Sequence, residues 1–226
     1  MSRIHDFIIS GGKKMKAKFD NLYQFTSYIP LIDLTFHQYL IDIDEPILVH
    51  TGNKKQAEAI IPQIKEVLGN KELKYIFVSH FEADECGGVG LILKEYPSAK
   101  VIASEVTARQ LDGFGLVSDV LVKEAKSTLR IGDTDFKFIG YPSEMHLWEG
   151  LLLFDLKRGT LFSSDLMIRF GNSGGKVLES TLDKELDRIT KDQVPDKEKR
   201  EKLIDDLKKE DIKFIATGHG ECIRIV

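Results

Sequence analysis

Four side chains that can bind a metal ion follow one apolar run within a few residues. Residues 79–90 read SHFEADECGGVG, so His80, Glu82, Asp84 and Glu85 come directly after Tyr75-Ile-Phe-Val. Three carboxylates held close together repel one another, and a bound dication removes that repulsion. The segment therefore predicts a metal site on a strand-to-helix loop. The alternative is a solvated acidic loop whose carboxylates favour the start of the next helix.

Three more candidate ligands each follow or sit in a turn after a β-type segment. His146 comes after the segment 134–141, Asp165 ends the run Leu-Phe-Ser-Ser-Asp, and His219 lies in the turn Thr-Gly-His-Gly. If strands and helices alternate, these strand ends meet at one edge of the sheets, where ligand sites commonly form. The other histidines have no acidic cluster beside them and are interpreted as structural: His5, His37 and His50.

The first half of the chain must supply the scaffold for the acidic loop. Segments 22–29 and 35–43 are rich in Tyr, Phe, Thr and Ile, which predicts an antiparallel pair of strands. Apolar residues at helical spacing predict a helix over 56–68, which Pro62 should kink or break. Further strands are predicted at 47–49, 75–78 and 100–103, with a helix from the glycines at 87–90 to residue 96.

From Val120 the pattern changes to shorter β segments with glycines at the turns, which predicts a second and more antiparallel sheet. Its strands are expected at 120–122, 134–141, 151–156 and 160–163, and a further strand is expected at 212–216. Residues 178–211 are dense in Lys, Asp and Glu with apolar positions at helical spacing, which predicts two amphipathic surface helices. The glycine-rich loop 171–176 lacks the spacing of a phosphate-binding loop, so it is interpreted as a mobile cover over the metal pocket.

Composition narrows the class of protein. A chain of 226 residues with a formal net charge of -4 predicts one domain over residues 1–226 and argues against a binder of nucleic acid or of anionic membranes. The apolar run near the N-terminus is too short for a signal peptide and no segment approaches a membrane span, so we expect a cytoplasmic protein. Cys86 and Cys222 are interpreted as small buried thiols.

The ordered series His80-x-Glu82-x-Asp84-Glu85, His146, Asp165 and His219 resembles the ligand series of the metallo-β-lactamase superfamily. In particular it is similar to the diiron domain of flavodiiron proteins, and the similarity spans nearly the whole chain. The resemblance implies an α/β fold of the four-layer αβ/βα sandwich type. Hydrolases of the superfamily have histidine at the positions of Glu82 and Glu85, whereas the flavodiiron pattern has histidine only at the second. Glu85 therefore departs from both patterns.

Carried over position by position, the resemblance implies two iron ions per chain, with zinc or manganese as alternatives. One metal would have His80, Glu82 and His146, the other Asp84 and His219, and Asp165 would bridge them. Glu85 is left open: it either ligates, ligates through water or stays unbound. A set of three histidines and several carboxylates suits metals that change oxidation state.

The resemblance also implies a function. We expect a non-haem diiron protein that binds and reduces dioxygen or nitric oxide, or that acts as an oxygen or redox sensor for a signalling partner. No flavin-binding segment follows His219, so we expect no flavin on this chain and a separate electron-donor protein, with a homodimer as one arrangement. The alternative is a metal-dependent hydrolase of an ester, lactone or phosphodiester.

Overall fold

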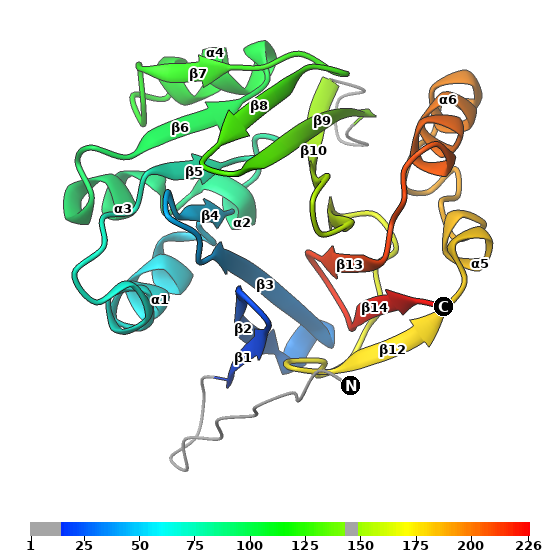
Figure 1. The fold of residues 1–226 in the computed structure, drawn as a ribbon, viewed down its shortest axis with the longest axis horizontal. Helices are drawn as coiled ribbons and strands as arrows, with labels where there is room; N and C mark the ends of the chain where they lie inside the picture. The colour runs from blue at the N-terminus through cyan, green and yellow to red at the C-terminus, as the bar shows by residue number, and fades with distance from the viewer. Residues whose placement is uncertain (1–14, 143–148) are drawn as a thin grey trace.

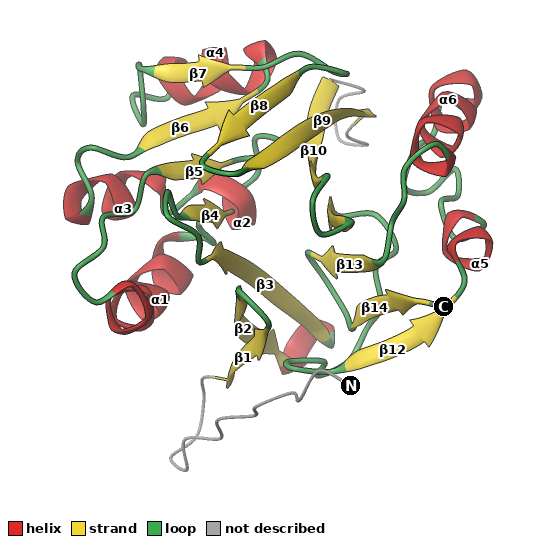
Figure 2. Ribbon diagram, in the orientation of Figure 1, coloured by secondary structure: helices red, strands yellow, loops and turns green. Residues whose placement is uncertain are grey.

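The computed structural model describes residues 15–142 and 149–226, which form two seven-stranded sheets packed face to face. Helices cover the outer face of each sheet (Figure 1), so the layers run helix, sheet, sheet, helix. Figure 2 shows the same arrangement by element type. The expected α/β fold, a four-layer αβ/βα sandwich, is confirmed.

The first sheet keeps its strands in chain order, antiparallel from β1 to β4 and parallel from β4 to β7. The antiparallel pair expected at the start is therefore confirmed as β2 and β3. The segment at 120–122 was expected in the second sheet, and that prediction is wrong. It pairs with β6 in parallel, with Leu121 opposite Ile102, a long-range pairing that local sequence does not encode. The strands are β1 (Met15–Phe19), β2 (Leu22–Ile29), β3 (Leu34–Ile41), β4 (Ile47–Val49), β5 (Tyr75–Phe77), β6 (Lys100–Ala103) and β7 (Val120–Val122).

The second sheet has the order β12-β14-β13-β11-β10-β9-β8 and is mainly antiparallel, as expected. Two pairs in it are parallel, β11 with β13 and β12 with β14. Residues 178–180 form part of β12 rather than a helix, because Leu178 pairs with Ile223 on β14. The strands are β8 (Thr128–Ile131), β9 (Thr134–Pro142), β10 (Glu149–Asp155), β11 (Thr160–Ser164), β12 (Val177–Ser180), β13 (Phe214–Thr217) and β14 (Cys222–Ile225).

The helices lie outside the sheets, and the two predicted amphipathic helices of the C-terminal region are present as α5 and α6. The acidic segment after β5, expected as a loop, contains the short helix α2. The elements are the 3-10 helix η1 (Pro30–Ile32) and the α-helices α1 (Lys54–Leu68), α2 (Ala83–Cys86), α3 (Val89–Glu95), α4 (Glu105–Gly113), α5 (Leu182–Leu186) and α6 (Lys197–Lys208).

Helix α1 begins with a capping box, in which the side chain of Asn53 accepts from the amide of Gln56 and the side chain of Gln56 accepts from the amide of Asn53. The helix continues through Pro62, so the predicted break is wrong. Pro62 and Glu58 are both exposed. Water can therefore solvate the Glu58 carbonyl that Pro62 leaves without its helical partner.

Three apolar layers hold the sandwich together. One lies between the first sheet and helices α1 and α3, one between the two sheets, and one between the second sheet and helices α5 and α6. The middle layer includes Phe77 and Phe138, whose ring centroids are 6.1 Å apart. Burying one such side chain contributes roughly 1.5–3 kcal/mol. This packing fixes how the ends of strands from the two sheets face each other.

The glycine-rich loop at 171–176 is tied to the first sheet. The amide of Ser173 donates to the Thr35 hydroxyl at 3.1 Å, and the amide of Gly175 donates to the Gln24 side chain at 2.8 Å. Ser173 is fully buried. This bonding does not fit the mobile cover that the sequence suggested.

Both cysteines are buried free thiols, as expected. Burial raises the pKa of Cys86 and of Cys222 to about 12, so both stay protonated at neutral pH.

Candidate metal centre

Three strands from the two sheets end at one edge of the sandwich and deliver the candidate ligands. His80 follows β5, Asp165 follows β11 and His219 follows β13. Strands β11 and β13 are parallel neighbours, so their carboxyl ends meet. The packing of the two sheets then brings His80 to the same place, as the distances to Asp165 show.

Asp165 lies between the two histidines. Its Oδ2 atom is 3.2 Å from Nε2 of His80, and its Oδ1 atom is 3.2 Å from Nε2 of His219. A carboxylate that offers one oxygen to each of two imidazole groups has the arrangement expected of a bridging ligand.

The acidic segment surrounds this carboxylate. Oε1 of Glu82 and Oε2 of Glu85 are 3.6 and 3.9 Å from Nε2 of His80, and Oδ2 of Asp84 is 3.5 Å from Nε2 of His219. The ligand atoms form two groups, His80 with Glu82 and Glu85, and His219 with Asp84 and Glu85, and within each group they lie no more than 4.8 Å apart. Glu85 is the member that both groups share.

Helix α2 explains why neighbouring carboxylates reach different histidines. Glu82 has an extended backbone and is the N-cap, whereas Asp84 and Glu85 lie in the first turn. In an extended chain Asp84 would point the same way as Glu82, because the two residues are two positions apart. The helical turn instead directs Asp84 to His219 and leaves Glu82 beside His80.

Glycines allow the loop that follows α2 to pack tightly. A Cβ atom on Gly88 would lie 2.3 Å from the Cβ of Ala57 in α1, so a larger residue would force the loop away. The amide of Gly88 donates to the Gly52 carbonyl at 2.8 Å, and the amide of Thr51 donates to the Glu85 carbonyl at 2.8 Å. The acidic segment is therefore held against the loop between β4 and α1.

Electrostatics of the cluster show a need for positive charge. Burial raises the pKa of Glu85 well above its usual range, and the negative charge of Asp165 raises it further; the same two causes raise the pKa of Asp84. Burial alone would also raise the pKa of Asp165, but His219 and His80 hold it well below its usual range. Protein groups alone thus keep only part of this cluster ionised, and a cation would ionise the rest.

The histidines respond in the opposite direction. Burial alone would lower the pKa of His80, but Glu85, Asp165 and Glu82 raise it well above its ordinary value. For His219, Asp165 and Asp84 likewise outweigh burial and raise the pKa. In the absence of another cation, protonated imidazoles therefore supply the positive charge that the carboxylates require.

Buried polar atoms left unpaired support the same conclusion. Nε2 of His80, Oε2 of Glu85 and Oδ1 of Asp165 are buried and make no well-directed hydrogen bond among the described residues, although the His80 and Asp165 atoms lie 3.2 Å from Oδ2 of Asp165 and from Nε2 of His219. Such atoms are costly unless a ligand satisfies them. A nitrogen and two carboxylate oxygens that converge without well-directed hydrogen bonds fit a metal ion.

The far nitrogens of the two imidazoles are already engaged. Nδ1 of His219 is 2.9 Å from the Thr35 carbonyl, to which it can only donate, so the neutral ring has its lone pair on Nε2. Nδ1 of His80 is 3.0 Å from the Ser79 hydroxyl, which in turn is 2.8 Å from that of Ser164. These contacts orient both rings for binding through Nε2.

The Asp165 loop is held in an unusual conformation. Ser164 and Met167 have positive φ values of 49° and 63°. The loop is braced at its far end by Arg169, which donates to the fully buried Glu185 at 2.6 Å. A strained loop that is fixed at both ends can hold Asp165 between the two histidines.

Six of the seven predicted ligands therefore come together. The seventh, His146, lies outside the described residues, as does His5. His37 fits the structural role expected of it, because both ring nitrogens are bonded, at 2.9 Å to the Thr26 hydroxyl and 2.8 Å to the Gly220 carbonyl. His50, which was also interpreted as structural, directly follows β4 and lies at the same edge of the sheets as the cluster. Its position after a buried strand was the signal that could have drawn attention to it.

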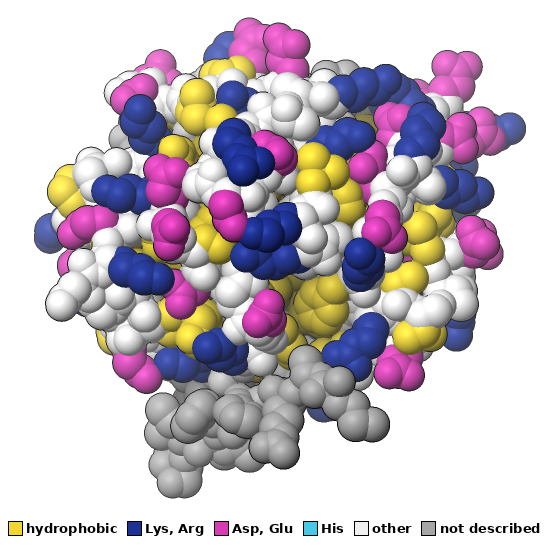
Figure 3. Space-filling model, in the orientation of Figure 1, with side chains coloured by type: hydrophobic (Ala, Val, Ile, Leu, Met, Phe, Trp, Pro, Cys, Tyr) yellow, Lys and Arg dark blue, Asp and Glu magenta, His cyan; other side chains and the backbone are white. Residues whose placement is uncertain are grey.

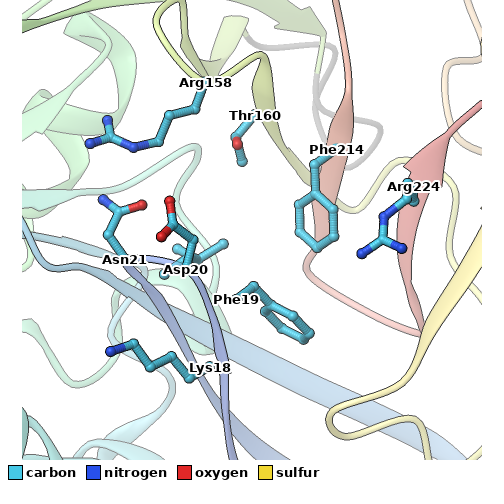
Figure 4. Close-up of a pocket in the computed structure, with 9 residues that line it drawn as sticks. Lys18, Phe19, Asp20, Asn21, Arg158, Thr160, Phe214 and Arg224 are labelled. Carbon is cyan, nitrogen blue, oxygen red and sulfur yellow. The ribbon is translucent and has the colours of Figure 1, made fainter. Parts of the chain in front are cut away.

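A recess on the surface, separate from this cluster, lies where strands β11 and β13 begin. It has a volume of about 290 Å³ and is visible in Figure 3 as a hollow with a hydrophobic floor and Lys and Arg side chains around it. Figure 4 shows its residues. They are Lys18, Phe19, Asp20, Asn21, Leu22, Arg158, Thr160, Phe214 and Arg224. None of them is a candidate metal ligand, so this recess is separate from the metal-type cluster.

The fold and the cluster together define a protein of the metallo-β-lactamase class, with a candidate metal site made of two groups of ligands. Comparison with known families agrees. The family described as "ODP family beta lactamase" matches residues 34–220, and the chain belongs to this family. It resembles the diiron domain of flavodiiron proteins.

Curated relatives include the putative diflavin flavoprotein A 2 of Nostoc, 29% identical over 82% of this chain and 33% of that protein. The probable hydroxyacylglutathione hydrolase glo2 of Schizosaccharomyces pombe is 30% identical over 57% of this chain and 53% of that protein. The chain thus spans about a third of the length of the Nostoc relative.

Solved structures show the same fold. The metal-soaked Flv1 flavodiiron core of Synechocystis has a TM-score of 0.78 at 18% identity, covering 94% of this chain and 57% of that one. The rubredoxin oxygen:oxidoreductase of Desulfovibrio gigas has a TM-score of 0.77 at 16% identity, covering 92% and 57%. Among the described helices, none is long and apolar enough to cross a membrane.

Proposed function

We propose that this chain, as a single domain, holds a dinuclear metal centre at the edge where β5, β11 and β13 end. Asp165 would bridge the two metals, and the observation that carries the proposal is its position 3.2 Å from each imidazole. The other ligands would divide between the two metals in the same way as the two groups of ligand atoms described above. One metal would have His80, Glu82 and His146, and the other would have Asp84 and His219.

Glu85 belongs to both groups, and its Oε2 atom is buried without a partner. We therefore assign Glu85 to the centre as a carboxylate that would serve both groups of ligands. It takes the place where the flavodiiron pattern has a neutral imidazole.

The donor set favours iron. The described donors are four carboxylates and two imidazoles, with no thiolate among them, because Cys86 is held as a thiol by burial. Oxygen-rich sets with some imidazole suit Fe(II) and Mn(II), whereas structural zinc favours nitrogen and sulfur. A pair of iron ions, when bound, would supply open coordination positions for a diatomic gas and a change of oxidation state.

The function supported best is that of a non-haem diiron protein that binds dioxygen or nitric oxide, with electrons from a separate donor or with a signalling partner that senses its state. In support, one relative is named an anaerobic nitric oxide reductase flavorubredoxin, from Salmonella typhi, 22% identical over 62% of this chain. The protein's own residues would orient the metals and keep the ligand rings fixed. Buried Thr35 and Ser79 would do so through the far nitrogens of His219 and His80.

A hydrolase is the second candidate, and the glo2 relative favours it. Glu82 speaks against it, because the hydrolases of the superfamily have histidine there. Glu82 lies 3.6 Å from Nε2 of His80, within one of the two ligand groups, so this carboxylate belongs to the cluster and cannot be discounted as a surface residue.

Metal analysis of protein purified without oxygen separates the two. About two iron ions per chain, together with a change in visible absorption when dioxygen or nitric oxide is added, would support the diiron protein. Two zinc ions per chain with hydrolysis of an ester, lactone or phosphodiester would support the hydrolase instead. A chain that binds neither iron nor zinc would overturn both candidate functions.

A further inference from the structure

His50 is a buried histidine beside the metal-type cluster that the ligand set does not use. It follows β4 directly, and its amide donates to the carbonyl of Phe77 at 2.9 Å. Its φ is 63°, in the left-handed region that side chains with a Cβ atom rarely adopt. Strained residues of this kind gather at functional sites, where the surrounding structure holds them in place.

The side chain of His50 is only partly satisfied. Its ring stacks on Phe77 with centroids 6.4 Å apart, and the residue is 4% exposed. Its Nε2 atom is buried without a hydrogen-bond partner among residues 15–142 and 149–226. His37, by contrast, is equally buried but bonds through both nitrogens. A buried nitrogen without a hydrogen bond costs free energy, so packing alone does not explain a histidine at this position.

The surroundings connect His50 to the cluster. The next residue, Thr51, donates to the Glu85 carbonyl from both its amide, at 2.8 Å, and its hydroxyl, at 3.2 Å. Burial lowers the pKa of His50 to about 3, and the charges of His80, Asp165 and His219 also act on it. His50 is therefore a neutral imidazole, able to donate one hydrogen bond without adding charge.

The unpaired atoms in this region are complementary. A neutral imidazole offers one N–H group. Oε2 of Glu85 is a buried acceptor without a hydrogen-bond partner among the described residues, and Oδ1 of Asp165 is buried 3.2 Å from Nε2 of His219 but makes no well-directed hydrogen bond among them. We infer that His50 is a positioning residue of the metal centre, which fixes the orientation of these carboxylates through its imidazole when the centre is filled. The inference rests on the proposed function, because it requires that Asp165 and Glu85 hold metal.

Cobalt(II) is a suitable probe, because its visible absorption reports the geometry of its ligands. The full chain, freed of metal by chelation, would be titrated with Co(II) without oxygen, and the affinity measured by competition with a chelator. His50→Phe retains a ring that can stack on Phe77 but has no nitrogen. We expect it to weaken Co(II) binding by roughly tenfold to a hundredfold, as loss of an outer partner of a metal ligand does, and to change the absorption spectrum.

Two further variants make the test decisive. His50→Gly suits the positive φ and removes the ring, so it remains informative if His50→Phe does not fold, and we expect the same loss of affinity. Phe77→Leu removes the stacking partner and leaves the imidazole, so we expect a spectrum and an affinity like those of the wild type.

The outcomes separate the inference from the proposed function. A folded His50 variant with the wild-type affinity and spectrum would overturn the positioning role, and so would an equal loss of affinity in Phe77→Leu. A wild-type chain that takes up no Co(II) and no Fe(II) would defeat the proposed function itself.

Discussion

The two ends of strands β11 and β13 are built in opposite ways. At their carboxyl ends lie Asp165 and His219, buried and with unpaired ligand atoms in the surrounding cluster. At their amino ends lie Thr160 and Phe214, in the recess of Figure 4, where the charged groups are more exposed.

The cations of the recess already have partners. Arg158 donates to Asp155 at 2.9 Å, Arg224 lies 3.8 Å from Glu179, and Nζ of Lys18 lies 4.9 Å from the centroid of the Tyr23 ring. The charged groups of the recess are thus satisfied, whereas the cluster at the carboxyl ends contains buried polar atoms that a ligand would satisfy. Buried polar atoms without hydrogen bonds, rather than open volume, therefore support the carboxyl ends of these strands as the candidate site.

The largest effect is expected at Asp165. Asp165→Ala removes the one carboxylate that reaches both histidines, so we expect metal content to fall from about two ions per chain towards none. Elemental analysis after anaerobic loading with iron measures this. Asp20→Ala in the recess is the control and should retain the full content; two metals retained in Asp165→Ala would rule out the bridging role.

The second largest effect is expected at Arg169, which fixes the far end of the Asp165 loop. Arg169→Met leaves Glu185, which is fully buried, without its 2.6 Å partner. Breaking a buried ion pair on one side costs about 3–5 kcal/mol, so we expect a loss of that size in the free energy of unfolding, measured with urea. Arg188→Met, which removes a half-exposed group 3.9 Å from the same carboxylate, should cost much less. Equal losses in the two variants would contradict the assignment of Arg169 as the brace.

Metal removal should destabilise the protein by a smaller amount. A ligand that binds only the folded state adds about 2.7 kcal/mol when its free concentration is 100 times Kd. We expect the midpoint of thermal unfolding to fall on treatment with a chelator and to recover when Fe(II) is restored. An Asp165→Ala chain should show no such shift, and a wild-type chain that shows none would count against the centre.

A change at Glu85 should alter the metals without removing them. Glu85→His replaces an anion that favours the more oxidised metal by a neutral ring, so we expect a more positive reduction potential with both metals retained. A redox titration followed by visible absorption measures this. The exposed control Glu66→His should leave the potential unchanged, and loss of a metal in Glu85→His would contradict this expectation by showing that an imidazole cannot take the place of this carboxylate.

The smallest effect is expected in the recess. The side chain of Arg224 is 44% exposed and its contact with Glu179 is long. We expect Arg224→Gln to change the free energy of unfolding by about 0.5 kcal/mol or less and to leave metal content unchanged, because exposed pairs contribute little. A larger loss, or loss of metal, would show that the two ends of the strands are not as different as proposed.

The sequence by itself determined the chemistry of the metal-type edge. His80, Glu82, Asp84, Asp165 and His219 were identified because each follows a β-type segment, and strand ends in such folds converge at an edge. Apolar segments likewise determined most strands, and the αβ/βα layering followed from the resemblance of the ligand series to the metallo-β-lactamase superfamily.

Tertiary structure alone decided which partners each element has. The segment at 120–122 joined the first sheet and residues 178–180 became a strand, since pairing with β6 and with β14 overrode the local pattern. Helix α1 continued through Pro62 because that residue faces solvent, which the sequence does not state.

The site depended on tertiary structure in the same way. The turn of α2 separated Asp84 from Glu82, and sheet packing placed Asp165 3.2 Å from two histidines that are 139 residues apart in the chain. His50 has no acidic neighbours in sequence and became a candidate only when β4 was seen to end beside the cluster. Residue types set which ligands and charges are available, but distances and unpaired atoms arise only when remote segments pack together.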